Sequence, residues 1–378
     1  MVVTALSSPP EERRLALVPP AIKRLRGLGH EVHLTPGYGA PLGVSDADLE
    51  EAGAKLVASE RARAGADVAL VVQPPSREAL EGLRPGTAVL GFLDPFFARD
   101  TVRALLDARL RGMCVELMPR TTYAQKMDAL SSQASLAGYV AVILAAQRID
   151  KVLPMMSTPA GTITPARVFV LGVGVAGLQA IATAKRLGAR VDAYDTRPVV
   201  AEQVRSLGAR FVEFDLGGDQ GQTEQGYAKA LTEEQLERQR EQMAKVVAQS
   251  DVVITTAQVF GRAAPRLLGA AALAGMKPGS VVVDLAASTG GNVEGTVAGR
   301  EVVTDGGVHI VGLHPLPASV ARDASLMYAA NLVHVIEHAW QEGALRAPDE
   351  DPIVDAVLLT DDGAVRNDAV RERLEDSA

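Results

Sequence analysis

The chain has 378 residues, 47% of them hydrophobic and 22% charged, which is typical of a globular protein long enough for two domains. Its formal net charge of −8 argues against a nucleic-acid-binding surface and favours solubility. The single cysteine, Cys114, excludes an internal disulfide framework and favours a reducing compartment, and its apolar neighbours predict a buried thiol.

Two further absences in the sequence concern the compartment. No N-terminal segment combines basic residues, an apolar stretch and a cleavage site, so we expect no signal peptide. The longest apolar run, residues 136–146, is shorter than the roughly 20 residues that span a membrane. We therefore expect a chain that is soluble on its own.

Residues 1–128 alternate between short apolar runs and amphipathic runs. Pro19 and Pro20 mark the start of a helix and Gly29 its end, and Ser45 is a predicted N-cap. This alternation predicts a mostly parallel sheet with helices on both faces. We expect strands at 2–6, 31–35, 66–72, 88–92 and 112–117, and helices at 20–29, 46–53, 76–82 and 100–109.

The remainder of the chain begins with a long helix at 128–150, whose small side chains suit a buried connection between two domains. A Pro- and Thr-rich crossing segment, 152–165, leads into a second doubly wound pattern. From Ser319 the chain runs helically to Trp340, and the simplest topology returns it to the first domain. We expect strands at 190–194, 210–214, 251–255, 280–284, 301–304, 309–312 and 353–360, and helices at 201–207 and 231–249.

The most informative stretch is residues 167–195, RVFVLGVGVAGLQAIATAKRLGARVDAYD. A β-branched run leads into a G-x-G-x-x-G turn, a helix follows, and a second strand ends before Asp195. Gly172 allows the tight turn, Gly174 lets the backbone approach a pyrophosphate, and Gly177 lets helix and strand pack closely. The helix N-terminus supplies amide N–H groups and a positive dipole end. The stretch therefore predicts a dinucleotide-binding site.

Asp195 bears on which dinucleotide is bound. A carboxylate there can accept hydrogen bonds from both ribose hydroxyls and would repel a 2′-phosphate, which favours NAD(H) over NADP(H). Arg197 tempers this preference, because a nearby Arg can receive the 2′-phosphate.

A polar, glycine-rich stretch, 216–226, lies between two predicted strands and is followed by Tyr227. Its composition fits a disordered surface loop. Its place beside the dinucleotide site fits a mobile lid, with Tyr227 closing over a nucleotide. Both interpretations stay open on the residues alone.

Together these motifs resemble those of proton-translocating NAD(P) transhydrogenase, specifically its NAD(H)-binding component in the form of a separate alpha subunit. The resemblance covers nearly the whole chain, and the spacing of Arg120, Gln125 and Asp128 is its most diagnostic feature. Its other carriers are Ala129–Ser132, Ala137–Tyr139, the glycine turn, Asp195–Pro198, Glu202–Val204, Gly226–Lys229, Thr255–Ala257, Val283–Ala287 and Gly290–Asn292.

The resemblance implies a role for each site residue. Arg120, Gln125, Asp128 and Ser131 would hold the nicotinamide with its ribose and phosphate, and would orient the ring toward its acceptor. Without the resemblance, these residues are better explained as a solvated loop whose Asp128 caps the next helix. The remaining implied NAD(H) contacts are Thr121, Thr122 and Tyr123; Val175, Ala176 and Gly177 at the pyrophosphate; Asp195, Thr196 and Arg197 at the adenosine ribose; Gly226 and Tyr227 at a lid tip; and Gln258 at a strand end where the family is usually apolar.

Alanine dehydrogenase shares the expected fold and provides a second interpretation. That enzyme needs a Lys and a His to bind and protonate its keto acid. Here the corresponding strands read Val71-Val72-Gln73-Pro74 and Phe92-Leu93-Asp94-Pro95, so only Arg14 remains. A non-catalytic NAD(H)-binding module is a third interpretation.

The histidines give no strong signal. His334 and His338 lack the H-E-x-x-H order of a zinc site, and we predict no metal. His314, a loop histidine near the predicted strand ends, could approach the nucleotide.

The sequence thus predicts an α/β protein of two doubly wound, parallel-sheet, Rossmann-like domains with a cleft between them. Residues 1–128 and 320–378 would form the first domain, and 129–319 the NAD(H)-binding domain. The resemblance implies a subunit that presents NADH for direct hydride transfer to NADP⁺ held on a partner, and that is active only with partner subunits. It further implies NADP(H)-binding and membrane-spanning partners, a homodimer, and a cytoplasmic location peripheral to the inner membrane.

Overall fold

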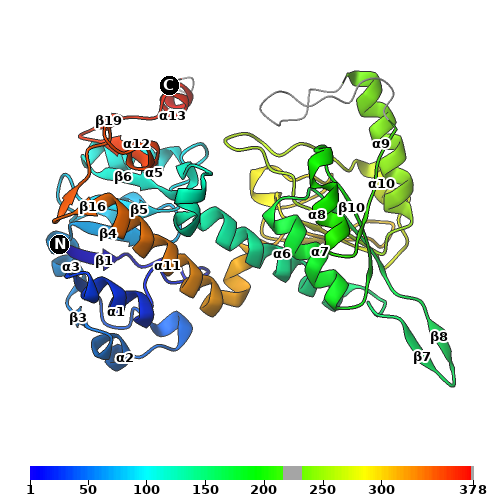
Figure 1. Ribbon diagram of the computed structural model, residues 1–378, viewed down its shortest axis with the longest axis horizontal. Coiled ribbons are helices and arrows are strands. Elements are labelled where there is room, and N and C mark those ends of the chain that lie inside the picture. The colour runs from blue at the N-terminus through cyan, green and yellow to red at the C-terminus, as the bar shows by residue number, and fades with distance from the viewer. Residues whose placement is uncertain (216–231, 376–378) are drawn as a thin grey trace. The chain divides into compact units, whose positions relative to one another are not determined.

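The computed structural model describes residues 1–215 and 232–375 (Figure 1). The chain forms two compact units. Unit 1 combines Met1–Gln133 with Val320–Ala378, and unit 2 is Ala134–Ser319. Gly226 and Tyr227, predicted to form the lid tip, lie outside the described residues.

Unit 1 is built on an eight-stranded sheet of order β19-β18-β6-β5-β4-β1-β2-β3. The strands from β3 to β6 run parallel, whereas β18 and β19 are antiparallel additions from the end of the chain. The strands are β1 Val2–Ala5, β2 Glu31–Leu34, β3 Ala54–Leu56, β4 Val68–Val71, β5 Ala88–Gly91, β6 Arg111–Cys114, β18 Leu358–Asp361 and β19 Ala364–Val365.

Both faces of this sheet are buried. Successive side chains of a strand point to opposite faces, so one strand can contribute to a hydrophobic cluster on each face. Along β4, Val68 and Leu70 belong to one hydrophobic cluster, and Ala69 and Val71 belong to another. Helices α1 and α11 cover the first face (Figure 1). The helices of the unit are α1 Pro19–Gly27, α2 Asp46–Glu51, α3 Ser59–Gly65, α4 Arg77–Leu80, α5 Arg99–Asp107, α11 Ala321–Ala339, α12 Pro352–Val357 and α13 Asp368–Glu375.

Unit 2 contains a seven-stranded sheet of order β11-β10-β9-β12-β13-β15-β14, parallel except for β14. Strands β10 and β11 lie on one side of β9 and strands β12 to β15 lie on the other, so the strand order reverses between β9 and β12. The strands are β9 Arg167–Leu171, β10 Arg190–Tyr194, β11 Arg210–Phe211, β12 Val252–Thr255, β13 Val281–Asp284, β14 Glu301–Val303 and β15 His309–Val311; the helices are α7 Val175–Arg186, α8 Ala201–Ser206, α9 Glu233–Ala248 and α10 Ala270–Ala274.

The doubly wound α/β fold predicted from the sequence is confirmed, and several local features agree with it. Ser45 caps α2 in a capping box with Asp48, as its position predicts. Cys114 is fully buried, and burial raises the pKa of its thiol well above the usual value. A buried neutral thiol of this kind is a core residue.

Other local expectations are wrong or incomplete. The crossing segment at 152–165 contains an antiparallel hairpin, β7 Met156–Thr158 and β8 Gly161–Ile163, which projects from the rest of unit 2 (Figure 1). The predicted strand at 112–117 ends at Cys114 and continues as a 3₁₀ turn, Val115–Leu117. The predicted strand at 353–360 is instead helix α12 followed by β18. Strand β3 and helices α3 and α10 were not expected.

Helix α6, Ala129–Arg148, also differs from expectation, because by length and composition alone it could cross a membrane; it is the single such helix among the residues that the structure describes. Several of its residues nevertheless make specific contacts with the protein. Gln133 accepts a hydrogen bond from Arg14 at 2.8 Å, and Arg148 pairs with Glu301. A Cβ on Gly138 would lie 2.1 Å from the Ala176 carbonyl oxygen. The helix therefore contacts protein along several turns.

Candidate functional site

The glycine turn lies where the strand order of unit 2 reverses, at the carboxyl ends of β9 and β12, which is where doubly wound sheets bind ligands. Gly172 has φ +94°, and a Cβ there would lie 2.5 Å from Thr256 Oγ1. A Cβ on Gly177 would lie 1.9 Å from the Gly172 carbonyl oxygen. The turn therefore requires both of these glycines for its own geometry.

Gly174 differs from the other two glycines of the turn, Gly172 and Gly177. It caps α7 with φ −83°, and a Cβ there would meet no atom within 4 Å. The backbone fold thus gives no reason for glycine at this position. Gly174 and Val175 are exposed at the positive end of the α7 dipole, and the open space above them leaves room for an anionic group to approach the backbone.

Asp195, the acid that follows β10, is hydrogen-bonded to the glycine turn. Its Oδ2 accepts a hydrogen bond from the Val173 amide at 2.8 Å, and its Oδ1 accepts one from the Arg197 amide at 2.8 Å. The Arg197 guanidinium forms a fork on the same carboxylate, with Nε to Oδ1 at 2.9 Å and Nη2 to Oδ2 at 3.0 Å. Thr196, between them, is exposed.

These contacts keep the Asp195 carboxylate charged. Burial alone raises its pKa, but the hydrogen bonds from Arg197 and Val173 outweigh burial and leave the pKa of Asp195 below its usual value. The acid predicted to meet the ribose is thus an ionised acceptor beside the turn.

Two residues without a predicted role shape the opposite rim of the unit 2 site. Buried Asp284, at the end of β13, accepts hydrogen bonds from the Ala286, Asn292 and Val293 amides and from the hydroxyls of Thr255 and Thr296. Fully buried Asn292 bonds both backbone groups of Ala257. The available signal was an Asp ending a buried strand before a glycine-rich segment.

Gln258 follows Ala257 on this rim. Its side-chain amide donates to the Leu285 carbonyl at 3.1 Å, so the exposed side chain connects the loops after β12 and β13. The structure thus gives Gln258 a contact within the protein.

The expected nicotinamide residues all lie in one segment of unit 1. Arg120, Thr121, Thr122, Tyr123 and Gln125 are exposed on and just before the 3₁₀ helix η3, Thr122–Met127. The segment is anchored to α11, because the Asn331 side chain donates to the Lys126 carbonyl at 2.9 Å.

Asp128 forms the start of α6 together with Ser131. The Ser131 amide donates to Asp128 Oδ1 at 2.9 Å, and its hydroxyl donates to Oδ2 at 2.5 Å. Asp128 therefore caps the helix, as the simpler interpretation of the sequence predicts. Its half-buried carboxylate is directed to Ser131 rather than to Arg120.

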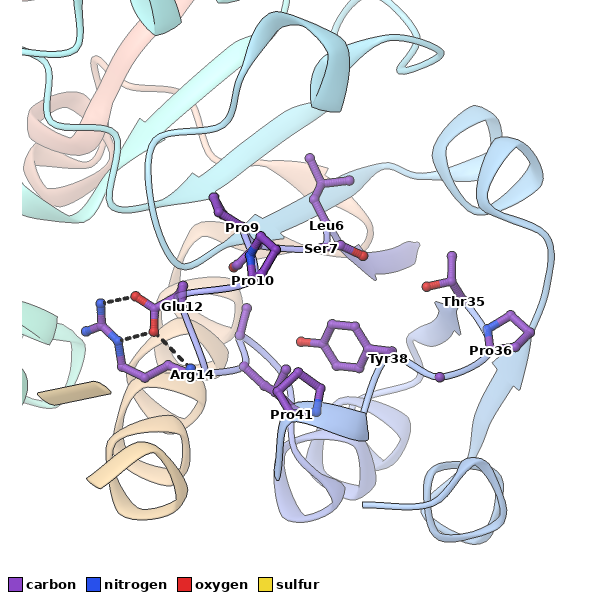
Figure 2. Close-up of a pocket in the computed structure, with 14 residues that line it drawn as sticks. Leu6, Ser7, Pro9, Pro10, Glu12, Arg14, Thr35, Pro36, Tyr38 and Pro41 are labelled. Atoms are coloured by element: carbon purple, nitrogen blue, oxygen red, sulfur yellow. Dashed lines mark hydrogen bonds and ion pairs between the residues drawn. The ribbon is translucent and has the colours of Figure 1, made fainter. Parts of the chain in front are cut away.

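Unit 1 also contains a small cavity of about 160 Å³ at the carboxyl ends of β1 and β2, whose lining includes Arg14 and Glu12 (Figure 2). Figure 2 shows the Arg14 guanidinium paired with Glu12, with Nε to Oε1 at 2.9 Å and Nη2 to Oε2 at 2.7 Å. Gln73 donates to the same carboxylate at 2.6 Å. The charge of Arg14 is therefore balanced by Glu12, and the residues that line the cavity offer no unpaired cation to a keto-acid carboxylate.

The sheet order, the glycine turn and the acid after β10 define a nucleotide-binding protein of the Rossmann class. Two family descriptions match, "Alanine dehydrogenase/PNT, N-terminal domain" over residues 7–137 and "Alanine dehydrogenase/PNT, C-terminal domain" over residues 141–368. The chain belongs to the alanine dehydrogenase/PNT family.

Within this family the chain is more similar to transhydrogenase subunits than to alanine dehydrogenases. It is 41% identical to an NAD(P) transhydrogenase alpha subunit chain of Rickettsia prowazekii, over 96% of this chain and 95% of the relative. The crystal structure of transhydrogenase from Sinorhizobium meliloti is 42% identical, with a TM-score of 0.84 over 98% of this chain and 100% of that one. The alanine dehydrogenase of Halomonas elongata is 30% identical over 96% of this chain and 93% of the relative.

Proposed function

We propose that this chain is the NAD(H)-binding alpha subunit of a proton-translocating NAD(P) transhydrogenase, and that it passes hydride to NADP⁺ held on a partner subunit. The observation that carries the proposal is the turn at Gly174, where the fold does not require glycine and a helix N-terminus lies open beside the ionised Asp195. A pyrophosphate fits this open turn, and a carboxylate after β10 favours an unphosphorylated ribose over a 2′-phosphate.

The chemistry of hydride transfer agrees with what the chain provides. The nicotinamide ring supplies the hydride, and the protein contributes binding and orientation. We assign the orienting role to Arg120, Gln125, Asp128 and Ser131, since amide, carboxylate and hydroxyl groups can hold a carboxamide and a ribose. Gln73 and Asp94 stand where alanine dehydrogenases need Lys and His, and a direct transfer has no need of that acid–base pair.

The proposal also assigns partners. A second subunit would hold NADP(H), and membrane-spanning subunits would couple hydride transfer to proton movement and keep this chain at the cytoplasmic side of the membrane. Relatives named as alpha subunits support the existence of such partners.

We further infer a homodimer that uses the β7–β8 hairpin. All residues of the two strands are exposed, and Met155, Met156 and Ile163 leave 66%, 45% and 48% of their surface open. An isolated two-stranded hairpin is marginally stable in water, so covering these apolar side chains with a second copy would stabilise it.

The test mixes the purified chain with the isolated NADP(H)-binding domain of a transhydrogenase, using NADPH as donor and an NAD⁺ analogue with shifted absorbance as acceptor. We expect hydride transfer only when both proteins are present. The NADP(H)-binding subunit from the same genome is tested in parallel, so that a species mismatch is recognised.

Two outcomes would contradict the proposal. NADH binding without transfer to either partner would favour a non-catalytic NAD(H)-binding module. NADH oxidation by pyruvate and ammonium with this chain alone would favour an alanine dehydrogenase.

A further inference from the structure

The Asp195 carboxylate is saturated by its own protein. A carboxylate offers about four lone-pair positions for hydrogen bonds. Four donors fill them here: the amides of Val173 and Arg197, and Nε and Nη2 of the Arg197 guanidinium. While both guanidinium bonds are made, the carboxylate therefore has no free position for a ribose hydroxyl.

The two partners differ in how firmly they are held. The Asp195 side chain is only 7% exposed, and the Val173 amide fixes it against the glycine turn. The Arg197 side chain is 41% exposed, and its further contact, Nη2 to the Val173 carbonyl, is long at 3.4 Å. Arg197 can thus leave the carboxylate by rotating into solvent, whereas Asp195 must stay where it is.

We propose that Arg197 is an internal competitor for the adenosine ribose site, so that NAD(H) binds only after the guanidinium fork has left Asp195. This inference rests on the proposed function and adds a specificity device to it. Because the competent state is a fraction of the population, the apparent NADH dissociation constant is raised by the inverse of that fraction.

Competition by Arg197 also affects the choice between dinucleotides. Once displaced, the guanidinium is free to pair with a 2′-phosphate, which partly offsets the repulsion between that phosphate and Asp195. Arg197 therefore weakens NADH binding and supports NADPH binding. It reduces the preference for NADH over NADPH that Asp195 creates.

The test measures NADH and NADPH dissociation constants of the full chain by calorimetry at low and high KCl. The variant is Arg197→Met, which keeps an unbranched stem and removes the fork, and Arg197→Lys serves as a milder second variant. Arg210→Met is the matched control, since Arg210 makes the same fork on Asp192, with Nε and Nη2 at 2.8 and 2.7 Å, away from the glycine turn.

We expect Arg197→Met to bind NADH roughly tenfold more tightly than the wild type at low salt, as for a competent state that is about a tenth of the population. NADPH should not gain affinity, so the preference for NADH rises. The tenfold difference should shrink at high KCl, because salt screens the half-exposed ion pair of the wild type. Arg210→Met should match the wild type.

Combining Arg197→Met with Asp195→Asn separates competition from a structural role. Arg197 should bind a neutral amide at position 195 more weakly than a carboxylate. In the Asp195→Asn chain, Arg197→Met should therefore add little to the affinity for NADH. Unchanged or weaker NADH binding by both Arg197 variants would overturn the inference while leaving the proposed function standing. A wild-type chain that binds no NADH would instead overturn the proposed function, and the inference with it.

Discussion

At the scale of single residues, the three glycines after β9 have separable duties. Gly177 is required by packing, because a Cβ there would lie 1.9 Å from the Gly172 carbonyl oxygen. Gly174 has open space around it and an ordinary φ of −83°. A methyl group at Gly177 should therefore affect folding, whereas a methyl group at Gly174 should affect binding.

We predict that Gly177→Ala lowers the free energy of unfolding by roughly 1–3 kcal/mol, because the added methyl group forces the turn apart. Gly174→Ala should unfold like the wild type and bind NADH roughly tenfold more weakly, since its methyl group would stand where the pyrophosphate approaches. Urea unfolding and NADH titration of both variants provide the measurements. A Gly174→Ala chain that binds NADH as the wild type does would contradict the pyrophosphate assignment.

At the scale of elements, η3 holds the proposed nicotinamide residues although its own side chains are mostly exposed. Its anchor is Asn331 of α11, which is 9% exposed. Asn331 donates to the Lys126 carbonyl and accepts from the Ser132 hydroxyl at 2.7 Å. One amide thus connects η3, α6 and α11.

We predict that Asn331→Ala slows hydride transfer roughly ten- to hundredfold, because a displacement of about 1 Å in an orienting element is enough for such a loss. The NADH dissociation constant should change far less, and the free energy of unfolding should fall by about 1–3 kcal/mol. Asn367→Ala is the matched control, since Asn367 bonds the Val370 amide in α13 of the same unit. Equal losses of rate and affinity would refute the orienting role.

The sequence allowed prediction of the elements whose periodicity and punctuation agree. The strand, glycine turn, helix and acid of residues 167–195 follow one another as predicted, because each depends on local chemistry. The C-terminal run at 353–360 was misjudged because a short apolar run fits a buried strand and a buried helix equally well. The structure decides it through Asp351, which accepts from the Ile353 and Val354 amides and starts α12 before Pro352.

The site was only partly predictable, because several of its contacts depend on the folded chain rather than on local sequence. Motif spacing indicated the glycine turn and Asp195, but the fork from Arg197 depends on a side-chain conformation that no spacing reveals. Asp284 and Asn292 act through backbone groups of loops that meet only in the folded chain. A sequence motif of fixed spacing cannot record such contacts.

At the scale of the whole molecule, the proposed dimer makes the β7–β8 hairpin a testable surface. We predict that replacing Met156 and Ile163 together by Ser shifts the chain from dimer to monomer, because each loses exposed apolar area that a second copy would cover. Sedimentation velocity over a concentration series measures the shift. Leu28→Ser, at an exposed apolar residue of unit 1, is the control and should leave the assembly unchanged.

The antiparallel pairing of β18 with β6 sets an order of events while the chain is being made. Unit 2 is one continuous segment, so it can fold as soon as it leaves the ribosome. The sheet of unit 1 must wait for the C-terminal segment, which supplies Thr360 for the Gly112 amide and Tyr328 for the end of β4. The N-terminal portion thus emerges first and is completed last, and in the interval the unpaired edge of β6 is open to pairing with another chain.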